Sequence, residues 1–528
     1  DVRGGSDLKN HVARMVAGIR GMFGDWNWNA DVNLNHAWLH TANFGFLNYA
    51  QLLSDINDGS YSFVNPASNS PGVIAALAPP LVKTSTTDMD SLDIGVTRDL
   101  WQLPGGPLGL ALGGQWRHEA QDDPDLNPNL AAQGLGIAHT IGSRNVAAVY
   151  GEVDAPLLKS LEVDLSARYD HYSDFGGAFN PKFGIKWTPI EQLAIRGTYS
   201  RGFRAPGFAE NGSSGVEGFI TETLPNDFRA AHGNDGYTLP YALGLESVGN
   251  PNIKPERATN WTFGAIFQPT QWFSATADYY AIKKTNLIIA GPLSAAALDA
   301  YFANPQNPQL PPGYTITLDR PDPAFPNEPP RPLVVNSPYA NANELKTSGV
   351  DIDLRGNFSL GPSAHLVSDF SATKIFTWKQ INSDGSVYQF VGTEGPYILS
   401  SGAGTPRYRA TWANTLTWGP WAVTGTIYYV SALRMSAPDV TGDNSCFSTD
   451  PNGNPFPPSC RMASFTDTDL TASYQITPNI QINGGILNLF DRKPPFDPIN
   501  YAGLNYNPTY AQAGIVGRFF KLGVDVKF

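Results

Sequence analysis

The sequence has little charge, few cysteines and no long apolar run. Charged residues make up 16% of its 528 residues, against roughly 25% in an ordinary soluble protein. The formal net charge of −12 argues against a nucleic-acid partner, because phosphate binding requires a basic surface. Two cysteines exclude a disulfide framework and a four-thiolate zinc site. No stretch of about 18 apolar residues occurs, which excludes transmembrane helices but leaves β-strand crossings open.

Aromatic residues, glycine and proline are abundant instead. Aromatics reach 12%, with 52 Gly and 43 Pro. The length alone would allow roughly three domains, yet short apolar runs between glycines and prolines favour one repetitive all-β structure. The first residue is Asp1 rather than Met, and no signal peptide is visible. We therefore expect a processed chain or a fragment.

Apolar and polar residues alternate in many segments. In one of them Leu161, Val163 and Leu165 share one face, whereas Glu162 and Asp164 share the other. A period of two is that of a β-strand, and about 17 such segments are each long enough to cross a bilayer at a tilt. They start near Ala13, Trp26, Asp90, Pro107, Asn145, Ser160, Phe179, Gln192, Arg257, Trp272, Glu344, Ala364, Arg407, Trp421, Asp467, Ile480 and Arg518.

Short and long connections alternate along the chain. Tight turns such as Gly419-Pro420 are followed by long segments rich in Pro, Gly and Asn, such as 207–254 and 290–343. Outer-membrane barrels have this layout, with short periplasmic turns and long extracellular loops. Charges in mid-strand and tryptophans beside the short turns fit a wet lumen and an interfacial girdle. The sequence therefore predicts an all-β transmembrane antiparallel β-barrel; the alternative is a secreted β protein with a sandwich core.

The odd number of strands has a consequence for the chain ends. With the short turns in the periplasm, the last strand ends there, and the first strand, near Ala13, starts outside. Bacterial barrels have an even number of strands, and unpaired edges in lipid cost several kcal/mol per unsatisfied group. We therefore expect residues 1–528 to be the C-terminal part of a larger barrel, with about 17 of an expected 22 strands.

Four strings and the last residue are similar to motifs of one family. Residues 199–206 (YSRGFRAP), 250–256 (NPNIKPE), 347–351 (TSGVD) and 488–494 (NLFDRKP) resemble, in this order, strings of the TonB-dependent outer-membrane receptors. Phe528 ends the last alternating strand and resembles the signal that the barrel-assembly machinery reads. The resemblance covers essentially the whole chain, but only the barrel half of the family's architecture.

The family also carries an N-terminal plug domain preceded by a short TonB-contacting box, and this sequence shows neither. The resemblance therefore implies that residues 1–528 are the C-terminal part of the receptor barrel, without the plug domain and the first strands. It implies four partners: the TonB complex through the missing N-terminal region, outer-membrane lipid, the barrel-assembly machinery, and a small-molecule ligand such as a ferric siderophore. It also implies the cell outer membrane of a Gram-negative bacterium as the location.

Cys446 and Cys460 lie in one predicted exterior loop. The exterior is oxidising, so we predict a disulfide between them. Closing a loop of this length contributes about 3 kcal/mol in the chain-entropy model.

Motifs of known enzymes and metal sites are not found in the sequence, so we expect no enzyme, no cofactor and no bound metal. Ligand contact is assigned instead to loop residues, because arginine pairs with anionic chelates and aromatic rings stack on sugars or catecholates. The alternative for each is loop packing. The predicted ligand-binding residues are Arg201, Arg204, His232, Tyr237, Tyr241 and Trp378.

The function favoured by these observations is active import of a scarce, bulky nutrient across the outer membrane. A ferric siderophore is the most usual substrate of the family that the chain resembles, and oligosaccharide and cobalamin are alternatives. A passive porin and a secreted adhesin or lectin-like protein are the alternatives from other classes.

Overall fold

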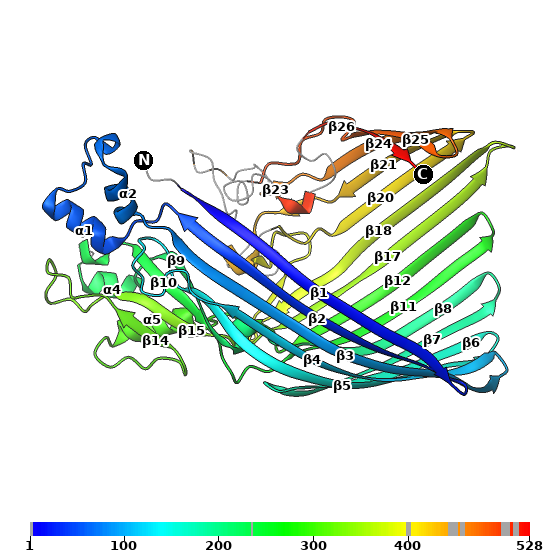
Figure 1. Cartoon of the computed structure of the whole chain (residues 1–528), viewed down its shortest axis with the longest axis horizontal. Helices are drawn as coiled ribbons and strands as arrows, with labels where there is room; N and C mark the ends of the chain where they lie inside the picture. The colour runs from blue at the N-terminus through cyan, green and yellow to red at the C-terminus, as the bar shows by residue number, and fades with distance from the viewer. Residues whose placement is uncertain are drawn as a thin grey trace.

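One large sheet of 22 strands dominates the computed structural model (Figure 1). The structure describes residues 4–233, 236–397, 403–441, 452, 454, 460–497, 507–510 and 517–527. Within these residues, seventeen strands follow one another as an antiparallel meander, which we call the wall. The wall strands are β1 (Gly5–Phe23), β2 (Trp26–Phe44), β3 (Leu81–Leu103), β4 (Gly106–Asp123), β5 (Ala138–Leu158), β6 (Leu161–Tyr172), β7 (Gly176–Ile190), β8 (Leu193–Arg204), β11 (Glu256–Thr270), β12 (Phe273–Thr285), β17 (Glu344–Ser359), β18 (Ala364–Ile381), β20 (Tyr408–Trp418), β21 (Trp421–Val430), β24 (Phe465–Thr477), β25 (Ile480–Leu487) and β26 (Phe519–Val526).

The predicted fold class is confirmed. Tight turns gather at one end of the wall and long loops at the other, and β1 begins at the loop end whereas β26 ends at the turn end (Figure 1). No ladder between β1 and β26 occurs among the described residues, so the wall is an open barrel there. Three strands begin earlier than their patterns predict, β1 at Gly5, β3 at Leu81 and β5 at Ala138. The early part of β3 is polar, yet it pairs with β2 up to Asn43, so pairing extends the strand beyond its apolar pattern.

The outer face of the wall carries exposed apolar side chains. On β6 and β7, Leu165, Tyr169 and Phe183 are all more than 40% exposed. Trp187 and Trp418, which lie beside tight turns, are 48% and 63% exposed. A surface this apolar is found where a protein contacts lipid or a partner, and its alternation with polar residues is that of a barrel wall.

The inner face of the wall carries ion pairs. Arg196 of β8 forms a two-pronged contact with Asp278 of β12, at 2.8 Å from Nε to Oδ1 and 2.5 Å from Nη2 to Oδ2. The strand between them is β11, where Gly264 pairs with both residues. A Cβ at Gly264 would overlap the Asp278 carboxylate. Glycine is therefore what lets the two charges meet across an intervening strand.

Two long loops form a compact body at the loop end, which we call the loop unit (213–233, 236–248 and 290–338). Its core joins residues of both loops, including Leu243, Tyr301 and Val335, all at most 1% exposed. The abundance of Pro and Gly in these two segments predicts irregular loops. The structure has helices and strands there instead, which are too short to show a clear periodicity in the sequence. The unit consists of β9 (Ser213–Glu222), α4 (Asn226–Ala231), η2 (Gly236–Thr238), β10 (Tyr241–Val248), α5 (Ser294–Ala303), β14 (Thr315–Leu318) and β15 (Pro332–Pro338).

The other elements are short and lie in connections. They are α1 (Tyr49–Asp58), η1 (Pro66–Ser68), α2 (Pro71–Leu77), α3 (Phe208–Asn211), β13 (Ile288–Ile289), β16 (Ala340–Asn341), β19 (Val387–Gln389), β22 (Leu433–Arg434), α7 (Pro438–Thr441), β23 (Arg461–Met462) and η3 (Pro508–Tyr510).

Of the helices that the structure describes, none has the length and apolar character needed to cross a membrane.

Substituting Gly264 by alanine is expected to destabilise the wall. The added methyl group would displace the Asp278 carboxylate from Arg196, and an exposed ion pair of this kind contributes up to about 1 kcal/mol. Gly425→Ala in β21 is the matched control, because nothing lies within 4 Å of a Cβ there. On semi-native gels, Gly264→Ala should unfold at a lower temperature than Gly425→Ala; equal temperatures would contradict the role given to Gly264.

Candidate ligand-binding site

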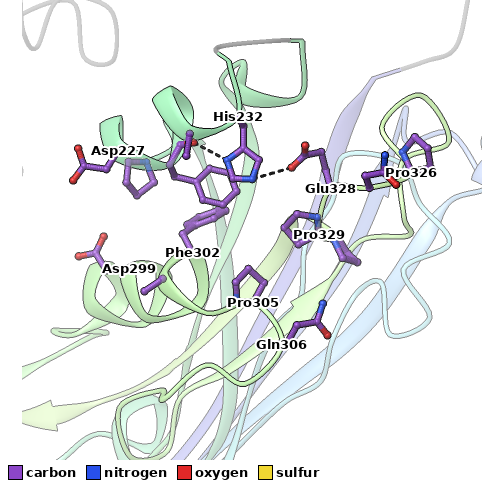
Figure 2. Close-up of a pocket in the computed structure, with 15 residues that line it drawn as sticks. Asp227, His232, Asp299, Phe302, Pro305, Gln306, Pro326, Glu328 and Pro329 are labelled. Carbon is purple, nitrogen blue, oxygen red and sulfur yellow. Dashed lines mark hydrogen bonds and ion pairs between the residues drawn. The ribbon is translucent and has the colours of Figure 1, made fainter.

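A cavity of about 660 Å³ opens in the loop unit (Figure 2). Its size falls in the range of roughly 300–1,000 Å³ that is usual for small-molecule pockets. Helices α4 and α5 and the proline-rich segment 326–330, which lies between β14 and β15, form its walls. The lining residues are Pro225, Asp227, Phe228, Ala231, His232, Asp299, Phe302, Ala303, Pro305, Gln306, Pro326, Asn327, Glu328, Pro329 and Pro330.

His232 joins the helix side of the cavity to the proline-rich side. It follows α4 directly, and its ring stacks on Phe228 with 3.9 Å between centroids. Its Nδ1 lies 2.7 Å from the Phe228 carbonyl oxygen, and its Nε2 lies 3.0 Å from Glu328 Oε2. Figure 2 shows the two contacts on opposite edges of the ring. The imidazole therefore fixes the distance between α4 and the proline-rich segment.

Two tyrosine hydroxyls hold the proline-rich segment in place. Tyr237 donates to the carbonyl oxygen of Pro329 at 2.6 Å, and Tyr301 donates to that of Pro330. Burial raises the pKa of Tyr301, so its hydroxyl stays a donor. Proline has no N–H and cannot continue a ladder, so these side chains replace the backbone bonds that a strand would make. The proline-rich side of the cavity is thus held in place by side chains from two other elements.

Arg331 completes this support from behind the cavity. Its Nη2 donates to the backbone oxygen of Tyr237 at 2.6 Å. Its guanidinium lies 4.8 Å from the ring centre of Tyr237 and 5.6 Å from that of Tyr241, both cation–π distances. Burial raises the pKa of Tyr241. The positive charge of Arg331 is therefore stacked between tyrosines rather than presented to a ligand.

The charged groups that line the cavity are acidic. Asp227 and Asp299 lie on one side and Glu328 on the other, with His232 between them (Figure 2). Among the described lining residues there is no Lys or Arg. Glu222, at the end of β9, lies near Asp299 but does not line the cavity, and burial together with Asp299 raises its pKa. The cavity therefore combines apolar walls of proline and phenylalanine with a negative rim.

The structure brings three of the six predicted ligand-binding residues together. His232 lines the cavity, whereas Tyr237 and Tyr241 support it, Tyr237 being only 1% exposed. Trp378 lies apart from them, in β18 of the wall, where its backbone pairs with Thr347 of β17. Their assembly at one site required the fold of the two loops, which no spacing along the chain reveals.

The two predicted arginines lie in or beside the wall. Arg204 contacts Glu210 at 2.9 and 2.8 Å and Glu256 at 2.8 Å, which fastens the start of a long loop to β11. Arg201 donates to the Tyr199 hydroxyl at 2.8 Å. Because Arg201 and Tyr199 alternate with the inner residues of β8, and Tyr199 packs on the exposed Trp261, Arg201 is on the outer face.

Most of the residues that line the cavity were not predicted from the sequence. Phe228, Phe302 and Glu328 come from three separate segments that meet only in the folded loop unit. A usable signal was the apolar, alanine-rich run at 294–303, which forms α5 inside a segment assigned as irregular. The prolines at 329 and 330 mark turns in any loop and do not by themselves indicate a site.

A second cluster joins the loops on the opposite part of the wall. Glu394 is fully buried and accepts a hydrogen bond from the Tyr397 hydroxyl at 3.2 Å. Tyr397 N–H donates to Asp439 of α7, and Asn507 donates to Asp497, each at 2.8 Å. Burial and the neighbouring Asp497 raise the pKa of Glu394 to about 9. Glu394 is thus protonated at neutral pH, which lets it lie beside a second carboxyl group.

Metal binding has no candidate in the described part of the chain: no group of three or more His, Cys, Asp or Glu side chains there could hold an ion. Cys446 of the predicted disulfide with Cys460 and the terminal Phe528 lie outside the described residues. The disulfide and the assembly signal therefore stay predictions.

Comparison with known proteins gives one family and several distant relatives. The family model of the TonB-dependent receptor-like β-barrel matches residues 6–489. The iron-regulated outer membrane virulence protein of Vibrio cholerae is 20% identical over 440 residues, 83% of this chain and 52% of the relative. The ferric enterobactin receptor PirA of Pseudomonas aeruginosa is 24% identical over 189 residues, 34% of this chain and 24% of the relative. The chain therefore covers about half or less of these curated relatives.

A solved structure shows the same fold at greater coverage. The siderophore receptor PirA from Acinetobacter baumannii superposes with a TM-score of 0.60 at 14% identity. The match covers 98% of this chain and 63% of that one. At this identity the likeness shows the fold alone.

Removing the Tyr237 hydroxyl is expected to loosen the cavity wall. In Tyr237→Phe the Pro329 carbonyl oxygen loses its donor, and a buried unpaired carbonyl costs about 1–3 kcal/mol. Amide hydrogen exchange should rise at Asn327, Glu328 and Arg331, the residues of this segment that have an amide proton, and stay unchanged in the wall strands. Tyr49→Phe, at an exposed position of α1, is the control. If exchange at 327–331 is the same in both variants, the tyrosine does not hold the segment.

The Glu394 cluster is expected to weaken as pH rises. The carboxyl keeps its proton up to about pH 9 in the folded cluster but loses it near 4.5 in the unfolded chain. The folded state therefore binds the extra proton, and its stability falls between about pH 5 and about pH 9. Limited proteolysis of 390–397 should be faster at pH 9 than at pH 6. Glu394→Gln should remove this dependence, whereas Asp384→Asn, on an exposed turn, should keep it.

Proposed function

The chain belongs to the TonB-dependent receptor β-barrel family, and we propose that the complete protein imports a scarce, bulky nutrient across the outer membrane of a Gram-negative bacterium. The observation that carries this proposal is the cavity in the loop unit, which lies at the loop end of a wall with an apolar outer face and a charged inner face. Such a wall separates lipid from a wet lumen, and a cavity at its outer end is where a ligand would first bind.

A ferric siderophore is the nutrient that we propose. Two relatives of this chain bear the names ferric enterobactin receptor and siderophore receptor, and another is named for its regulation by iron. Oligosaccharide and cobalamin would fill the same role in a family defined by its energy source rather than by one ligand. We propose His232 as a contact residue, with Tyr237 packed beside it and bonded to the proline-rich segment. Tyr237 and Tyr241, which stack on Arg331, stay proposed contacts as well. Arg201, Arg204 and Trp378 stay proposed contacts of lower rank, because their placement is in or beside the wall.

The proposed transport sequence has two stages. Ligand first enters the loop-unit cavity, which is lined by stacked rings and prolines. It then passes along the inner face of the wall, where Arg196 with Asp278 and Lys182 with Asp164 are already paired. We propose that the energy for the second stage comes from the TonB complex, acting on a plug in the complete protein.

The domain assignment is a proposal of the same kind. Residues 1–528 would be the C-terminal part of the barrel, with the plug and the first strands encoded upstream. Two observations support it: β1 and β26 are not joined among the described residues, and the chain covers 63% of the solved structure that it matches. Lipid around the apolar outer face and the barrel-assembly machinery at Phe528 would be the further partners.

Uptake of radiolabelled iron tests this function. A strain that lacks the gene should lose uptake of iron supplied as ferric siderophores from its own culture, and the full-length gene should restore it. Energised import requires that removing TonB also abolishes uptake. Restored uptake without TonB would indicate a passive porin, and unchanged uptake in the deletion strain would sink the siderophore assignment. Parallel assays with radiolabelled cobalamin and maltooligosaccharides distinguish the other substrates.

A further inference from the structure

The negative rim of the loop-unit cavity bears on which ligand the cavity selects. Asp227 and Asp299 are exposed at its mouth, and neither has an ion-pair partner among the residues that the structure describes. Glu328, opposite them, forms its one ion pair within the described part of the chain with His232. A ligand that enters the cavity therefore meets two carboxylates whose charges are not balanced by the protein.

The basic residues near the cavity do not offset this charge. Arg331 is stacked on Tyr237 and Tyr241 and is hydrogen-bonded to a backbone oxygen, and it does not line the cavity. Arg229 lies on α4 beside Asp227, but its Nη2 is bonded to Asn226, and it does not line the cavity. Clefts lined by one sign of charge favour ligands of the opposite sign. The potential of this cavity therefore opposes an anion.

The remaining lining suits an aliphatic ligand. Pro225, Pro305, Pro326 and Pro329 present ring methylenes, and Phe302 and the Phe228–His232 stack add flat apolar faces. Burying methylene groups against such walls is favourable without any charge on the ligand. The negative rim thus favours ligands without net negative charge, and the apolar lining residues accept an aliphatic chain.

We propose that this cavity selects ferric complexes of neutral or positive net charge, of the trihydroxamate kind, over trianionic triscatecholates. The inference rests on the proposed function, since it takes a ferric siderophore as the nutrient. Three hydroxamates balance the charge of ferric iron, and a pendant ammonium makes the complex cationic. Three catecholates leave the complex with three negative charges. Asp227 and Asp299 are the specificity-determining residues, because they are the exposed lining carboxylates without an ion-pair partner among the described residues and could each pair with an ammonium group.

Affinities for three ferric probes test the selection. The probes are a linear trihydroxamate with a free ammonium, the same compound with that amine acetylated, and a triscatecholate. Full-length protein in detergent should bind the ammonium probe most tightly and the triscatecholate most weakly. The preference for the ammonium probe over its acetylated form should be about threefold to tenfold, as expected for two exposed ion pairs, and should shrink in high salt.

The double variant Asp227→Asn, Asp299→Asn separates charge from fold. It should lose the preference for the ammonium probe while binding the acetylated probe as before, which also shows that the cavity is intact. Asp319→Asn removes an acidic group of the loop unit that does not line the cavity, and it should keep the preference.

Three results would overturn the selection. They are equal affinity for all probes, tightest binding of the triscatecholate, and a preference that survives in the double variant. In these cases the uptake experiment still decides whether the protein imports ferric siderophores. If no probe binds and iron uptake does not depend on the gene, both the selection and the proposed function fail.

Discussion

Pairing of every strand with its neighbours along the chain is the constraint on which the rest of the structure depends. A strand that leaves its N–H and C=O groups unpaired loses several kcal/mol per group in an apolar medium. An antiparallel meander meets this need with tight turns at one end, so all variation in length falls to the other end. The same pairing fixes which side chains face inward. Gly264 lies between Arg196 and Asp278 because the registers of β8 with β11 and of β11 with β12 place it there.

In the loop unit, too, backbone groups need hydrogen-bond partners, but side chains rather than neighbouring strands supply them. Its proline-rich segment cannot donate backbone hydrogen bonds at its prolines, yet the carbonyl oxygens of Pro329 and Pro330 still need donors. Tyr237 and Tyr301 supply them from the surrounding core, where both rings are only 1% exposed. A segment held through side chains rather than through a ladder can carry a curved, apolar wall. The cavity is a direct result of this arrangement.

How much of this was predictable differs between the wall and the loops. Each wall strand has one apolar face, so apolar residues recur at every second position and reveal the strand in the sequence. The strands that start at Leu161 and Trp421 begin where this pattern predicts. The cavity has no such pattern, since Asp227, Asp299 and Glu328 lie far apart in the sequence. Residue chemistry predicted His232 as a ligand contact, which stays a prediction although the residue lines the cavity, and it did not show that Tyr237 is buried. The contacts of Arg204 with two glutamates likewise depend on pairing between β8 and β11.

The distribution of charge differs between the cavity and the wall, which would give the two proposed stages of transport different tasks. At the mouth of the cavity, Asp227 and Asp299 are exposed and have no ion-pair partner among the described residues, so they hold charge available for a ligand. Along the wall, Asp278 and Asp164 already face Arg196 and Lys182. A charge that is paired attracts a passing cation less than one that is free. In the transport that we propose, the cavity would therefore hold a cationic ligand more strongly than these two paired sites of the wall, and passage requires binding that is weak enough for the ligand to leave.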